Sequence, residues 1–183
     1  MKLRLAALLL FGVLVLSASA KPKRLADRAP SLCEQGEETL YSCPFARGTG
    51  SVCMGGGRLR YRFGNPNKPN FEITSTADWS NVHLGSVSGG GGGHEDHIRF
   101  TNRETHYVVF VMDEGSLMDH PGRRRSGIAV VQGVPGKGDK YLDCRAHATI
   151  APNWDGKANG VVSGRQDEGP EYEEPDGPFD IWF

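Results

Sequence analysis

Apolar and polar residues alternate with a period of two along several short stretches of the chain, which predicts β-strands. The clearest alternation lies at 58–63, where large apolar residues alternate with arginines. The two sets are Leu59, Tyr61 and Phe63, and Arg58, Arg60 and Arg62. Other predicted strands are 39–45, 71–74, 82–87, 98–101, 106–112, 127–132 and 140–147. Clusters of Gly, Pro and Asn separate these stretches and are typical of turns.

About eight strands predict an all-β domain, an antiparallel sandwich or barrel. The 25 glycines and the charged fraction of 23% favour short elements joined by tight turns. No stretch after residue 20 keeps a 3.6-residue apolar period over three turns, so we expect no long helix. The predicted core includes Leu59, Tyr61, Phe63, Ile98, Phe100, Val109 and Val130. We therefore expect Phe63→Ala to destabilise the fold strongly, because it removes a buried ring. Arg62→Ala should change the stability by well under ~1 kcal/mol.

The first twenty residues are typical of a secretory signal peptide. Positive charges at Lys2 and Arg4 precede an apolar run at 5–16, and small residues at 18–20 follow it. This run is shorter than the ~20 residues that span a bilayer. We expect cleavage before Lys21, a mature chain without a transmembrane segment, and a periplasmic or secreted location.

The mature chain divides into three predicted parts. Residues 21–32 form a flexible N-terminal arm, 33–150 the β domain, and 151–183 an irregular C-terminal segment rich in Gly, Pro and acidic residues. Large apolar side chains are costly to leave in water. We therefore expect this last segment to dock onto the sheet through Phe179, Ile181, Trp182 and Phe183.

Four cysteines, Cys33, Cys43, Cys53 and Cys144, predict two disulfides in an oxidising compartment, because their spacing does not fit a zinc site. A hairpin centred on Gly48 would place Cys43 opposite Cys53 and leave Cys33 to pair with Cys144. The alternative pairs Cys33 with Cys43 and Cys53 with Cys144. A one-residue bulge would change the register, so both pairings stay open.

The stretch SGGGGGHEDHIRF at 88–100 holds five glycines and then His94, Glu95, Asp96 and His97. It lacks the Lys and helix start of a phosphate loop. A strand would point His94 and His97 to opposite faces, so we interpret the stretch as the polar tip of a hairpin. No serine lies in a G-x-S-x-G elbow. We predict no catalytic residue, no metal ligand and no cofactor. The sequence favours a binding protein over an enzyme.

Arginines form the other candidate site. Arg58, Arg60 and Arg62 share one strand face, and Arg123 to Arg125 occupy a predicted turn. Guanidinium groups suit carboxylates and phosphates, so the strand arginines are candidates for binding an anionic partner. The alternative is a solvated strand face. The net charge is −1, or −3 without Lys2 and Arg4, which gives no case for nucleic acid as a partner.

Several short motifs are shared with one group of proteins. They are Cys43, Ser51-Val52-Cys53, Tyr61-Arg62-Phe63-Gly64, the glycines before Ile98-Arg99-Phe100, Tyr107-Val108-Val109, Leu142 with Cys144, and Phe179-Asp180. In these motifs the chain resembles uncharacterised secreted proteins of Gram-negative bacteria, which often have a small or aromatic residue where this chain has HEDH. The resemblance implies export and no particular activity.

These observations predict an exported soluble protein that binds a protein or an anionic envelope component. One alternative is an inhibitor similar to the small β-barrel proteins that protect bacteria against lysozymes, which are also exported and disulfide-linked. A second alternative is a metal-dependent hydrolase that uses His94 and His97.

Overall fold

The structure is a computed structural model of the 183-residue chain. It describes residues 30–66, 68–89, 91–136, 138–145, 147–163, 177–179 and 181–183. The predicted signal peptide and most of the predicted N-terminal arm lie outside the described residues.

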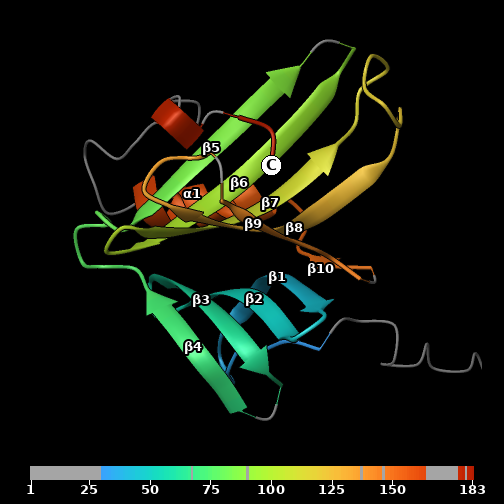
Figure 1. Cartoon of the computed structure of the whole chain (residues 1–183). Coiled ribbons are helices and arrows are strands. Elements are labelled where there is room, and N and C mark those ends of the chain that lie inside the picture. The colour runs from blue at the N-terminus through green and yellow to red at the C-terminus, as the bar shows by residue number, and fades with distance from the viewer. Residues whose placement is uncertain are drawn as a thin grey trace, which may run out of the picture.

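The described strands form two antiparallel sheets of five strands each, packed face to face (Figure 1). The first sheet has the order β10-β1-β2-β3-β4, with β10 Thr149–Ile150, β1 Glu38–Phe45, β2 Gly48–Gly55, β3 Arg58–Asn65 and β4 Lys68–Thr74. The second has the order β5-β6-β7-β8-β9, with β5 Val82–Gly89, β6 Gly93–Asn102, β7 Thr105–Asp113, β8 Arg124–Gln132 and β9 Lys140–Asp143. The predicted all-β fold is confirmed, as a sandwich.

The core lies between the sheets because the apolar positions of the alternating strands face inward. Tyr61 of β3 lies at its centre, with ring centroids 5.8 Å from Phe100 and 5.6 Å from Tyr107 of the second sheet. The predicted core residues Leu59, Tyr61, Ile98, Phe100 and Val109 are buried. Phe63 and Val130 are partly buried at the margin of this core.

A helix, α1 Trp154–Ser163, lies in the stretch predicted to be irregular, which corrects that prediction. Trp154 and Ala158 are buried in the main core, and the Trp154 ring lies 6.1 Å from that of Tyr41. The helix contacts β1 and β3 of the first sheet and β5 and β6 of the second. Packing against both sheets stabilises it despite two glycines in its sequence.

The two disulfides link Cys33 with Cys53 and Cys43 with Cys144, so both predicted pairings are wrong. The β1–β2 turn lies at 46–47, since Phe45 pairs with Gly48 and Cys43 lies opposite Gly50. Cys43 therefore faces the core. Its disulfide with Cys144, the residue after β9, links the two sheets. Cys53 is joined to the N-terminal segment instead.

The disulfides are typical of a protein that folds outside the cytoplasm. Within the described residues, no helix has the length and apolar character needed to cross a membrane.

Candidate functional site

The arginines of β3 meet carboxylates of the chain itself. Arg62 is only 3% exposed, so the expectation of a solvated face is wrong at this position. Its Nε lies 2.5 Å from Oε2 of Glu72, and its Nη1 donates to Glu37 and, at 3.3 Å, to the carbonyl of Leu32. Arg60 Nη1 lies 2.9 Å from Oε1 of Glu37.

The segment at 30–37 covers this outer face of the first sheet, which explains the burial. Leu32 is buried against it, and the disulfide of Cys33 attaches the segment to β2. The structured region thus begins earlier than the predicted boundary at residue 33. Arg58 lies at the margin and donates to the carbonyl of Ser75 at 3.2 Å. The face predicted to bind an anion is an internal ion-pair network.

Burial alone would raise the pKa of Glu37, but hydrogen bonds from Arg62 and the Glu34 backbone hold it below its usual range. The charges of Arg62 and Arg60 lower it further. Glu37 is therefore ionised at neutral pH and satisfies the buried arginine.

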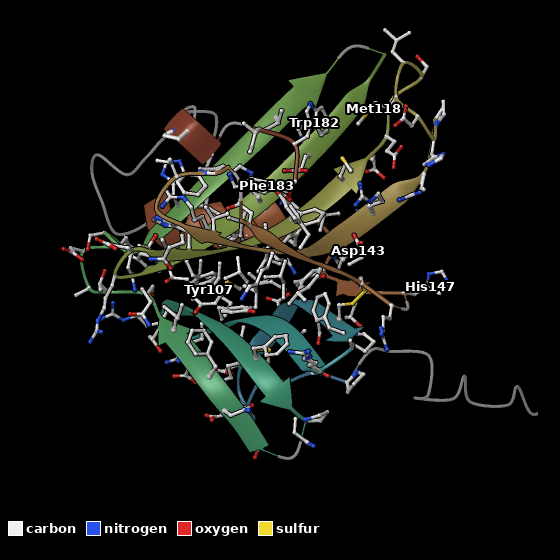
Figure 2. The ribbon with its side chains drawn as sticks, in the orientation of Figure 1. Tyr107, Met118, Asp143, His147, Trp182 and Phe183 are labelled. Carbon is white, nitrogen blue, oxygen red and sulfur yellow. A yellow bond between two sulfur atoms is a disulfide. The ribbon has the colours of Figure 1, made fainter. Side chains whose placement is uncertain are left out.

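A second group of arginines lines an open cleft, which we call the arginine cleft. It has a volume of about 540 Å³ and lies where the chain passes from β9 of the second sheet to β10 of the first. Its lining residues are Arg123, Arg124, Arg125, Ser126, Asp143, Cys144, His147, Ala148 and Ile150. Asp143 and His147 mark this region in Figure 2. The volume is within the range of small-molecule sites.

The cleft arginines have different neighbours. Arg125 lies 3.0 Å from Asp143, Arg123 3.3 Å from Glu114, and Arg124 3.7 Å from Asp113. In the last pair both side chains are 59% exposed. Ion pairs this exposed contribute little in water, so an incoming anion can compete for the guanidinium group.

Glu114 organises the loop that carries Arg123. Its side chain is only 5% exposed, and its Oε2 accepts the backbone N–H of His120 at 3.0 Å. Its own backbone N–H donates to the carbonyl of Arg123 at 2.9 Å. These bonds fix the loop across 114–123 and hold Arg123 at the cleft. The sequence indicated the arginines but not this buried acceptor.

The HEDH stretch lies in β6, and its side chains alternate between the faces of the second sheet. His94 approaches Ser88 and places Nε2 2.8 Å from Oδ1 of Asp96. Glu95 and His97 lie on the outer face, where both are buried beneath Phe183. His94 and His97 thus point to opposite faces, as predicted, and do not share a site.

The glycine run before it closes a hairpin. Gly91 and Gly92 adopt φ of 77° and 79°, which side-chain-bearing residues rarely adopt. Gly115 approaches Gly93 so closely that a Cβ added to Gly115 would lie 2.2 Å from the backbone nitrogen of Gly93. Gly91 and Gly92 are therefore explained by a tight turn, and Gly93 by close backbone packing.

One group of potential metal ligands occurs in the described residues, formed by Cys33, Glu37 and Cys53. Both sulfurs belong to the disulfide, so they are not thiolate ligands.

Comparison of the chain with protein-family models, curated proteins and solved structures finds no match. The function must therefore be argued from the geometry of the chain.

Proposed function

We propose that the protein is an exported binding protein and that the arginine cleft binds an anionic group of an envelope component, such as a phosphorylated or carboxylated glycan. The main support is the convergence of Arg123, Arg124 and Arg125 on one open cleft of about 540 Å³. Guanidinium groups donate two parallel hydrogen bonds to phosphate or carboxylate oxygens.

The neighbouring groups fit this role. Arg124 is exposed, Arg125 is held by Asp143, and Ser126 and His147 add hydroxyl and imidazole groups to the lining. Cys144 lines the cleft, and its disulfide ties it to Cys43 of the first sheet, which limits rearrangement on binding. The metal-dependent hydrolase has no comparable support, because His94 and His97 lie on opposite faces.

Arg124→Gln is expected to weaken binding of an anionic oligosaccharide about tenfold, the value of one charge-assisted hydrogen bond pair at ~1.4 kcal/mol. Isothermal titration calorimetry with a phosphorylated oligosaccharide and its neutral parent measures this effect. We expect affinity only for the phosphorylated form, and a decrease in affinity as salt rises.

The matched control is Arg103→Gln. Arg103 lies in the turn between β6 and β7, at the opposite end of β7 from Asp113. Its replacement by glutamine removes the same positive charge as Arg124→Gln does. Equal losses at positions 103 and 124 would show a general charge effect and contradict a site in the cleft. Equal binding of the neutral and phosphorylated sugars would also contradict it.

A further inference from the structure

An exposed apolar side chain lies at one end of the second sheet, in the loop that leads to the arginine cleft. This loop, residues 114–123, joins β7 to β8 and reaches the same end of the sheet as the turn between β5 and β6 (Figure 1). Leu117 is 80% exposed, more than any other large apolar residue that the structure describes. The loop ends at Arg123, which lines the cleft.

Two further large side chains lie beside this loop. A Cβ added to Gly93, the first residue of β6, would lie 3.0 Å from Sδ of Met118 and 3.4 Å from Cη2 of Trp182. Figure 2 shows both side chains at this end of the sheet. Trp182 is held there by its neighbour Phe183, which is 5% exposed and packs against the outer face of the sheet. We call Leu117, Met118 and Trp182 the apolar tip.

Hydrogen bonds fix the loop that presents Leu117. The backbone N–H of Ser116 donates to the carbonyl of Gly91, in the β5–β6 turn, at 2.8 Å. At the base of the loop, the N–H of Gly122 donates to the carbonyl of Glu114 at 2.8 Å. A leucine that stays in water gains none of the free energy that burial supplies. The loop thus holds an apolar side chain outward on a fixed support, as a contact surface requires.

Positive charge lies next to the apolar tip. Arg123 ends the loop and Arg124 begins β8, with side chains that are 48% and 59% exposed. Peripheral proteins are held on membranes by apolar side chains that enter the boundary between headgroups and acyl chains, and by basic residues that attract anionic lipids. Tryptophan is enriched at the same boundary. Asp119, exposed in the loop, opposes this attraction and so provides a test of its sign.

We propose that the protein docks through the apolar tip on a membrane that contains anionic lipids, and that the anionic group bound in the arginine cleft is the phosphate of a lipid headgroup. This inference rests on the proposed binding of an anion in the cleft and adds the carrier of that anion, a bilayer surface. Leu117 enters the boundary between headgroups and acyl chains, while Arg123 and Arg124 contact the phosphates. A soluble phosphorylated sugar would use the arginines but would not need Leu117.

Vesicle flotation tests the proposal with protein purified after export, because the apolar run at 5–16 would itself bind lipid. Vesicles of phosphatidylcholine and phosphatidylglycerol in equal parts should bind the wild-type protein, less so as salt rises, and phosphatidylcholine alone should bind it weakly. Leu117→Ser should lower the partition coefficient about tenfold and Arg124→Gln about fivefold. Asp119→Asn should raise it, because a charge repelled by the anionic surface is removed.

The matched control is Val134→Ser. Val134 is 65% exposed in the loop after β8, at the opposite end of that strand from Arg124. Both serine variants should keep the thermal stability of the wild type, because neither side chain is buried. Equal losses of vesicle binding at positions 117 and 134 would show general apolar adsorption and overturn the proposal. Vesicle binding that responds neither to Arg124→Gln nor to salt would also overturn it.

Trp182 provides a second measurement, because the other two tryptophans, Trp79 and Trp154, are each 3% exposed. Lipids brominated near the headgroup end of their acyl chains should quench its fluorescence in anionic vesicles. Trp182→Phe should abolish this quenching. A wild-type protein that binds the vesicles without quenching would refute docking through the apolar tip.

Titration with the soluble phosphorylated oligosaccharide separates membrane docking from anion binding in the cleft. Leu117→Ser should bind this soluble ligand as the wild type does. A wild-type protein that binds the soluble ligand but no vesicles would refute membrane docking and leave the cleft proposal standing. Absence of binding in both assays would refute both.

Discussion

Replacing Arg62 by alanine is expected to lower the free energy of unfolding by about 3–5 kcal/mol, as for other buried ion pairs that lose one partner. The guanidinium is 3% exposed and pairs with Glu37, which is itself 9% exposed, and with Glu72. Without Arg62, the carboxylate of Glu37 is left buried with Arg60 as its remaining cationic neighbour. Urea denaturation followed by circular dichroism measures the loss.

Arg58→Ala is the matched control, on the same strand and the same face. Arg58 donates to a backbone carbonyl and is less buried than Arg62, so we expect a loss below ~1 kcal/mol. A similar loss at both positions would contradict a specific role for the buried network.

The same network predicts a pH dependence. Because the pKa of Glu37 lies below its usual value in the folded protein, its ionised form stabilises the fold above the unfolded pKa of about 4.5. This contribution is lost as the pH falls through the lower, folded pKa. In Arg62→Ala the hydrogen bond that lowers the pKa is absent, so the loss of stability between neutral and acidic pH should be smaller than in the wild type.

The alternation at 58–63 predicted the strand and its two faces, because a period of two follows from strand geometry alone. It could not predict which polar residues are buried. Arg62 is covered because Glu37 and Leu32, which are distant in sequence, fold over it. As a result, Arg62 is more buried than Phe63, the reverse of the predicted order. Which strand residues are covered by other segments depends on the tertiary structure, and a strand's own sequence does not show it.

The disulfide pairing failed for a local reason. The equal spacing of Cys43 and Cys53 about Gly48 predicts this glycine at the centre of the hairpin, but it is the first residue of β2. A Cβ there would lie 2.7 Å from the carbonyl oxygen of Gly64 on β3, and its φ is 147°. Glycine is thus required by the neighbouring strand rather than by the turn. The resulting shift of the centre by more than one residue places Cys43 and Cys53 on different faces.

The helix and the arginine cleft show two further limits. Trp154 and Ala158 have helical i, i+4 spacing, but Gly156 and Asn159 between and beside them weaken the signal. At the cleft, the sequence indicated Arg123 to Arg125 but not the opposite wall. His147 lies in the connection between β9 of the second sheet and β10 of the first, and it lines the cleft. The local sequence pattern does not show where the chain crosses from one sheet to the other.

Removing the Cys43–Cys144 disulfide by a double substitution to alanine is expected to cost about 4–5 kcal/mol, and removing Cys33–Cys53 about 3 kcal/mol. The first closes a loop with a sequence separation of 101 residues and the second one of 20. In the entropic model, the longer loop restricts the unfolded chain more strongly. Cys43 is also fully buried in the main core, so its loss adds a small cavity.

The two double variants serve as matched controls for each other, since each removes two sulfurs and no charge. Thermal and urea unfolding should rank the wild type above Cys33→Ala/Cys53→Ala, and that variant above Cys43→Ala/Cys144→Ala. The first variant should also loosen the segment at 30–37 and make Arg62 more accessible, because Cys33 attaches this segment to β2. The reverse ranking would mean that the attachment of this segment over the buried Arg62 network stabilises the fold more than the covalent link between the sheets.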